Sequence, residues 1–72
     1  MGDHVYKKIQ VVGSATESLD RAIRNAIETA GETVQNMRWF EVDEIRGHIE
    51  GNQVAHYQVS LQIGFTIERS KD

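Results

Sequence analysis

Residues 53–67, QVAHYQVSLQIGFTI, alternate between apolar and polar side chains along almost their whole length. The apolar side carries Tyr57, Val59, Leu61, Ile63, Phe65 and Ile67, and the other side carries His56, Gln58, Ser60, Gln62, Gly64 and Thr66. Successive side chains of a strand point to opposite faces of a sheet. The alternation therefore predicts an antiparallel strand with one buried face over residues 53–68.

The residues that precede this strand predict its partner in a β-hairpin. Gly51 and Asn52 are typical of a two-residue turn, which places the first strand at residues 37–50. With this turn the facing pairs are Phe40 with Ile63, Val42 with Leu61, and Trp39 with Gly64. This register agrees with the apolar pattern, because a slip by one residue would turn every side chain to the wrong face. The pattern of the first strand fails at residues 44–46, which indicates a β-bulge or a departure from the core.

The N-terminal half of the chain predicts a further strand and a helix. We expect the strand at residues 4–12, a break at Gly13 and Ser14, and one amphipathic helix at residues 16–35. Ser14 begins a capping-box pattern, although Thr16 is an equally good N-cap.

The order of these elements is β-α-β-β, which predicts an α+β fold. We expect one domain over residues 1–72, with a single helix lying across the apolar face of a three-stranded antiparallel sheet. Gly31 lies inside the predicted helix, where it indicates either close packing or early fraying. One helix covers one face of a sheet, so the polar face is left for solvent, a ligand or another subunit.

Size and composition favour self-association. A chain of 72 residues buries only roughly 60% of the surface that its unfolded form exposes, and the absence of cysteine excludes disulfides and thiolate metal sites. The net charge is −3 and the eight Lys and Arg residues are scattered, which disfavours nucleic-acid binding. No apolar run approaches the ~20 residues of a membrane span and the first four residues form no signal peptide, so we expect a soluble cytoplasmic protein without membrane partners.

Trp39 is the only tryptophan, and the predicted register turns it away from the core. Phe40 and Val42 share the apolar face, whereas Trp39 lies beside Glu41 on the polar face. An indole offers a wide, rigid surface with little rotamer freedom to lose, and it is suited to stacking on a flat ligand or on a partner subunit. Gly64 opposite Trp39 leaves room for the ring.

Gln58 shares the polar face with Trp39 but lies six residues further along the strand direction, which corresponds to roughly 20 Å. One protomer cannot bring both side chains to a small ligand unless the sheet curls strongly, whereas a symmetric interface between subunits can. The alternative is that Trp39 is only an interface anchor and Gln58 a solvated strand residue.

The histidines do not favour a metal site. In the register above, His48 and His56 lie on opposite faces, and neither they nor His4 belong to a helical metal-binding motif. We therefore expect no bound metal, and two strand histidines hydrogen-bonded to their neighbours.

The remaining charged candidates give little support to catalysis. Glu41 and Asp43 share a face, but carboxylates on a strand are mostly solvated, and the chain has no nucleophile or phosphate-loop motif. We expect no enzyme; an acid–base role for Glu41 or His56 is the weaker alternative. Arg46, near the pattern break, could hold a phosphate or carboxylate, or pair with Glu44 or another acidic neighbour.

Several spaced motifs together resemble the dodecin family over nearly the entire chain. They are Val5-Tyr6-Lys7, Val11-Val12-Gly13-Ser14, Arg38-Trp39-Phe40-Glu41-Val42, Ile45-Arg46-Gly47-His48-Ile49, Ala55-His56-Tyr57-Gln58-Val59 and Ile63-Gly64-Phe65. The resemblance implies a hollow homododecamer of β-α-β-β subunits that stores or sequesters flavin and limits flavin photochemistry. The implied cofactor is FMN, with riboflavin or FAD as alternatives.

The resemblance also implies roles for individual residues. Trp39 is similar to the family tryptophan that stacks on the isoalloxazine ring, Gln58 to the glutamine that hydrogen-bonds the polar edge of that ring, and Arg46 to an arginine at the ligand or subunit contact. Many bacterial members carry an arginine where this chain has Thr66, which puts recognition of the FMN phosphate in doubt. The alternatives are a coenzyme A-binding assembly and an oligomeric scaffold whose Trp39 face is only a subunit interface.

Overall fold

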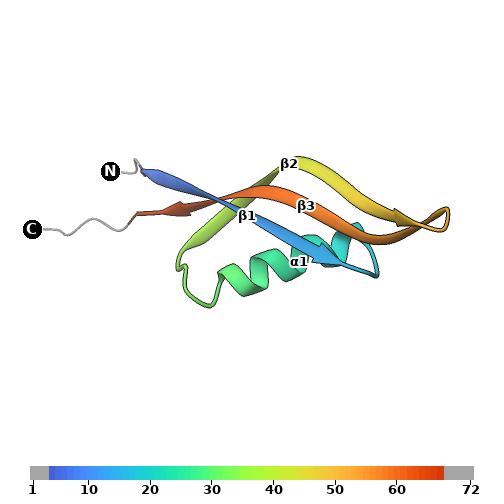
Figure 1. Cartoon of the computed structure of the whole chain (residues 1–72). Coiled ribbons are helices and arrows are strands. Elements are labelled where there is room, and N and C mark those ends of the chain that lie inside the picture. The colour runs from blue at the N-terminus through green and yellow to red at the C-terminus, as the bar shows by residue number, and fades with distance from the viewer. Residues whose placement is uncertain (1–3, 68–72) are drawn as a thin grey trace, which may run out of the picture.

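The computed structural model describes residues 4–67 and has the β-α-β-β order that the sequence predicts (Figure 1). The elements are β1 (Tyr6–Ala15), α1 (Leu19–Ala30), β2 (Met37–Glu50) and β3 (Gln53–Thr66). The three strands form one antiparallel sheet in the order β1-β3-β2, with β3 in the centre. Residue 68, at the end of the predicted last strand, lies outside the described residues, as do the ends of the predicted domain. No helix within residues 4–67 is long and apolar enough to cross a membrane.

The predicted break at Gly13 and Ser14 is wrong, because β1 continues through both residues to Ala15. Gly13 pairs with Val59 of β3 and is buried under the helix. A Cβ at Gly13 would overlap the carbonyl oxygen of Ala22 and would lie 2.7 Å from the Cβ of Ala26. The glycine is therefore the place where α1 packs most closely on β1, and it does not end the strand.

The helix is shorter at both ends than the predicted range of 16–35. Its N-cap is Ser18, whose Oγ accepts a hydrogen bond of 3.0 Å from the backbone N–H of Arg21, so the predictions of Ser14 and Thr16 were wrong. The helix ends at Ala30, and Gly31 is the C-cap, with its N–H donating to the carbonyl of Ile27. Gly31 therefore lies just after the helix and not inside it, and it is also closely packed, because a Cβ at this position would lie 3.1 Å from Cε of Met37.

The hairpin register is confirmed where the sequence predicts it. Trp39 pairs with Gly64, Phe40 with Ile63, and Val42 with Leu61. Gly51 and Asn52 form the turn with φ values of 58° and 66°, the left-handed conformation that a tight hairpin requires. The predicted irregularity lies between Val42 and Glu44, where Asp43 is an extra residue in β2.

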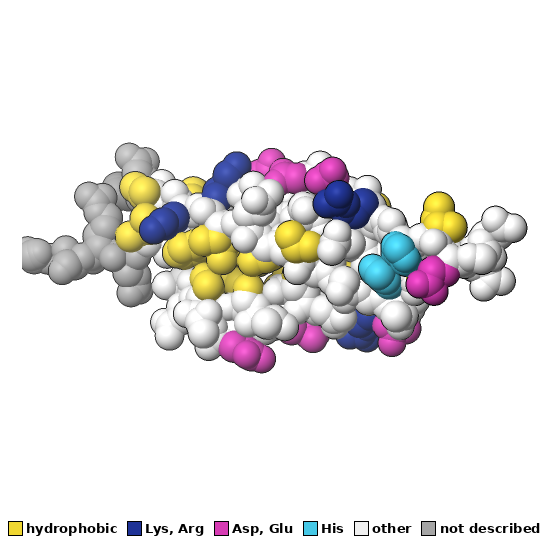
Figure 2. Space-filling view, viewed as in Figure 1, with side chains coloured by type: hydrophobic (Ala, Val, Ile, Leu, Met, Phe, Trp, Pro, Cys, Tyr) yellow, Lys and Arg dark blue, Asp and Glu magenta, His cyan; other side chains and the backbone are white. Residues whose placement is uncertain are grey.

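The buried core lies between α1, β1 and β3, and leaves β2 mostly uncovered. It consists of Ala15, Ala22, Ala26, Val59, Leu61 and Ile63. The single helix lies across the apolar face as expected and packs mainly against β1 and β3, whereas Met37 is the residue of β2 that packs against the core. On the helix side of β2, Phe40, Val42 and Ile45 stay exposed. Figure 2 shows hydrophobic side chains at the surface near the end of α1 and the beginning of β2.

Candidate ligand-binding site

Trp39 lies on the outer face, which we define as the face of the sheet that points away from α1. Its indole occupies the space above Gly64, because a Cβ at Gly64 would overlap the ring atoms Cζ2, Cε2 and Cη2. The residue is 38% exposed. One side of the ring thus rests on the backbone of β3, and its exposed surface can receive a flat molecule.

Tyr6 of β1 is the aromatic neighbour of Trp39. The two ring centroids are 6.0 Å apart and the rings are tilted by 59°. Tyr6 pairs with Thr66 on β3, two residues beyond Gly64, so both aromatic side chains stand at the same end of the outer face. Tyr6 was not among the residues that the sequence singled out for the site.

Arg38 is a site residue that the sequence analysis missed. The register of β2 shifts between Met37, which pairs with Phe65, and Trp39, which pairs with Gly64, so Arg38 is an extra residue in the strand. Its Nε donates a hydrogen bond of 2.8 Å to Oγ1 of Thr66. The predicted strand had a continuous register through residue 38, so the sequence did not predict this contact.

A groove adjoins Trp39 on the helix side of β2. It has a volume of about 200 Å³ and is lined by Ile27, Met37, Arg38, Trp39, Phe40 and Ile63. Apart from Arg38, the lining is apolar. Trp39 and Arg38 thus stand at the boundary between this apolar groove and the outer face.

Gln58 and Arg46 lie together at the other end of the outer face. The extra residue in β2 brings Arg46 directly opposite Gln58. Gln58 lies six residues from Gly64, roughly 20 Å along β3, so the protomer holds Trp39 and Gln58 apart as the sequence predicts. Within residues 4–67 no carboxylate is within ion-pair distance of Arg46, so the predicted alternative of a salt bridge with Glu44 was wrong.

The prediction that His48 and His56 lie on opposite faces was wrong. They are cross-strand partners, with ring centroids 5.4 Å apart and a tilt of only 14°. A register shift between His48 and Ile49, where Ala55 is an extra residue in β3, moves the partner of His48 from Ala55 to His56 and thereby reverses the predicted face, and the shift at Asp43 restores the predicted register. His48 Nε2 also lies 3.5 Å from a carboxylate oxygen of Glu50. No group of three or more acidic or histidine side chains in the described chain is arranged to hold a metal ion.

Comparison with known proteins gives a match over nearly the whole chain. A family model described as Dodecin matches residues 5–68. The chain belongs to the dodecin family. It is 46% identical over 66 residues to the dodecin of Thermus thermophilus, covering 92% of this chain and 96% of that protein.

Solved structures give the same result. The dodecin of Streptomyces coelicolor has a TM-score of 0.88 at 46% identity and is matched over 97% of this chain and 100% of that chain. A calcium dodecin from Mycobacterium tuberculosis, described with a novel calcium-binding site, has a TM-score of 0.76 at 25% identity over 94% of this chain and 97% of that chain. Dodecins are oligomeric, non-enzymatic proteins that bind small ligands, flavins among them.

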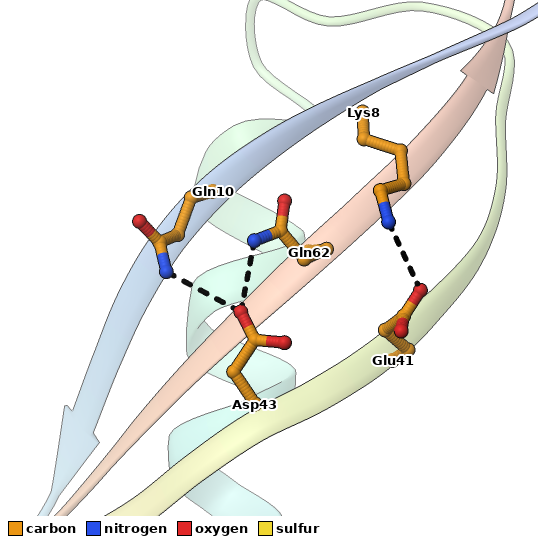
Figure 3. Close-up of polar contacts among 5 residues, drawn as sticks. All are labelled: Lys8, Gln10, Glu41, Asp43 and Gln62. Carbon is orange, nitrogen blue, oxygen red and sulfur yellow. Dashed lines mark hydrogen bonds and ion pairs between the residues drawn. The ribbon is translucent and has the colours of Figure 1, made fainter.

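The two candidate carboxylates of this dodecin hold the strands together. Asp43 Oδ2 accepts hydrogen bonds from the side-chain amides of Gln10 on β1, at 3.3 Å, and of Gln62 on β3, at 2.8 Å (Figure 3). Glu41 forms an ion pair of 3.4 Å with Lys8 of β1. These contacts link all three strands across the outer face, and both carboxylates are exposed to solvent as expected. The acid–base alternative for Glu41 is wrong, because the family is not enzymatic.

Proposed function

We propose that this dodecin stores or sequesters flavin in a homododecamer, with the isoalloxazine ring stacked on Trp39 where subunits meet. FMN is the first choice of ligand, with riboflavin or FAD as alternatives. Gln58 would hydrogen-bond the polar edge of the ring, and Arg46 would adjoin the ligand or the subunit contact.

The observation that carries this proposal is the position of Trp39. Its indole lies over Gly64 and keeps an exposed surface on the outer face, beside Tyr6. A flat, conjugated ligand can cover that surface with a large contact area while few side-chain rotamers become ordered. Membership of a family that binds flavins supplies a ligand of this shape.

The distance between Trp39 and Gln58 supports a site that is shared between subunits. The two residues lie roughly 20 Å apart in the register, too far to hold one ring within a protomer. A symmetric assembly can bring the Trp39 end of one chain beside the Gln58 end of another. The exposed apolar residues on the helix side of β2 give a reason for the chain to assemble.

Stacking on an indole would also explain a protective role. An excited flavin that lies against Trp39 can be quenched by electron transfer from the indole, which returns the flavin to its ground state before it reacts. Storage and limited photochemistry thus follow from the same contact.

Fluorescence titration of FMN, riboflavin and FAD against the wild-type protein and Trp39→Ala tests the proposal. Because stacking of a base on an aromatic ring is worth about 1–3 kcal/mol, we expect Trp39→Ala to bind flavin roughly 10- to 100-fold more weakly and to lose most of the quenching. Glu28→Ala, an exposed change on α1, is the matched control and should bind as wild type does. Undiminished quenching by a Trp39→Ala protein of unchanged mass would contradict the role of Trp39.

An oligomeric scaffold is the second candidate, and the uncovered apolar surface of β2 favours it. In that case Trp39 would be an interface anchor only. The same titration separates the two functions, because a scaffold assembles fully but shows no saturable uptake of any flavin.

A further inference from the structure

We propose that Arg38 recognises the phosphate of the ligand and makes this dodecin selective for a phosphorylated flavin, FMN, over riboflavin. The inference rests on the proposed function, because it takes the ring to be stacked on Trp39. It assigns a specificity-determining role to a residue that the strand pattern alone leaves without one.

The local backbone directs the Arg38 side chain across the strand boundary. Asn36 adopts a left-handed conformation with φ of 65°, and its carbonyl accepts a hydrogen bond of 3.1 Å from the N–H of Thr66. Arg38 is then the extra residue between two paired positions, and its Nε reaches Oγ1 of Thr66 at 2.8 Å. The bulge thereby anchors one edge of the guanidinium to β3.

This anchor holds the guanidinium close to the stacking surface. Thr66 lies two residues beyond Gly64 on the same face of β3, a separation of roughly 7 Å along the strand. The indole of Trp39 covers Gly64. The Arg38 guanidinium contacts Thr66, so its positive charge lies next to the ring along β3. In FMN the phosphate is joined to the ring system by a ribityl chain, and a cation beside the stacking surface, but not beneath the ring, suits that shape.

Charge also favours an anion at this position. Within residues 4–67, Lys8 pairs with Glu41 and Arg24 with Asp20, whereas no carboxylate is within ion-pair distance of Arg38. A guanidinium has five N–H donors in a fixed fork, and the contact with Thr66 uses only one of them. The remaining donors can bind two phosphate oxygens side by side, which is the strong form of this interaction.

In this arrangement Thr66 positions the Arg38 side chain. The resemblance to bacterial dodecins, many of which carry an arginine where this chain has Thr66, put recognition of the FMN phosphate in doubt. Here its hydroxyl orients an arginine that β2 supplies, so the guanidinium comes from the neighbouring strand. The chain can therefore keep a cation at this end of the outer face without an arginine at position 66.

The test compares FMN with riboflavin, because the two ligands share the ring and differ in the phosphate. We expect wild type to bind FMN roughly tenfold more tightly than riboflavin at low salt, as a charge-assisted hydrogen bond implies. Arg38→Ala should remove this preference by weakening FMN alone, with riboflavin affinity within about twofold of wild type. Arg21→Ala, which removes an equal charge from an exposed position on α1, is the matched control and should keep the preference.

Two further measurements complete the test. In the Arg38→Ala background, Thr66→Arg should restore part of the preference for FMN, because it returns a guanidinium to the same end of β3. Inorganic phosphate in millimolar amounts should weaken FMN binding but not riboflavin binding in wild type, and stronger binding of inorganic phosphate than of FMN would overturn the assignment to a flavin phosphate. Equal affinity of wild type for the two flavins, or a preference that survives Arg38→Ala, would overturn the inference. Failure of wild type to bind either flavin would instead contradict the proposed function.

Discussion

β1 and β2 both pair with the central strand β3, but only β1 is covered by α1. Leu61 of β3 is fully buried beneath the helix, whereas its cross-strand partner Val42 on β2 is 40% exposed on the same face of the sheet. One protomer therefore completes its core over two strands of its three-stranded sheet. The apolar side chains of β2 are then available for contact with another copy, as expected for a small chain without disulfides.

The largest expected change in stability comes from β3, which α1 covers. Leu61→Ala should destabilise the protein by about 2–5 kcal/mol, because it removes buried methyl groups from a core that cannot easily collapse around the cavity. Urea unfolding of dissociated protomers measures this change. Val42→Ala is the matched comparison at the facing position and should cost less than about 1 kcal/mol under the same conditions. Equal losses of stability at Leu61 and Val42 would mean that burial beneath α1 makes no difference between β3 and β2.

The second prediction concerns assembly. Val42→Glu places a charge among the exposed apolar residues of β2 and should reduce the particle mass seen by light scattering, since burial of an unpaired charge at an interface is strongly unfavourable. Gln35→Glu adds the same charge at an exposed position outside the strands and should leave the mass unchanged. A full assembly of Val42→Glu would show that this surface of β2 is not an interface.

The smallest expected effect concerns the N-cap of α1, the helix that covers β1 and β3. Ser18→Ala removes the N-cap of α1 and should lower the free energy of unfolding by about 1 kcal/mol, which thermal unfolding can follow. Ser14→Ala changes the other serine that precedes the helix and should have an effect below about 0.5 kcal/mol, because its side chain does not cap α1. A larger loss of stability for Ser14→Ala than for Ser18→Ala would show that Ser14, and not Ser18, is the N-cap of α1.

The hairpin could be predicted from the sequence because its information is local. The alternation of β3 and the Gly51-Asn52 turn predict the pairing of Trp39 with Gly64, and this pairing holds because the extra residues Ala55 in β3 and Asp43 in β2 cancel. The start of α1 could not be predicted in the same way. Ser14, Thr16 and Ser18 are all good N-cap residues, and the choice depends on how far β1 extends while Gly13 packs beneath the helix.

Only part of the candidate site could be predicted, because register shifts in the hairpin change which side chains face each other. A bulge adds one residue to a strand without a strong sequence signal, and it displaces every pairing as far as the next bulge. The extra residues Ala55 in β3 and Asp43 in β2 displace the pairings of residues 44–48, which makes His48 and His56 partners, and the shift before Trp39 turns Arg38 toward Thr66. Trp39 could be singled out because its ring is unusual on a polar face, whereas an exposed arginine on a strand carries no comparable signal.

The seat of Trp39 has a consequence for how a ligand is received. The indole already fills the volume that a side chain at position 64 would need, so its orientation is set by the backbone of β3 before any ligand arrives. A tryptophan has only two side-chain torsions to fix, and here the sheet restrains them in advance. The surface on which we propose that the flavin stacks is thus preorganised, so most of the stacking energy can appear as affinity instead of being lost in ordering the site.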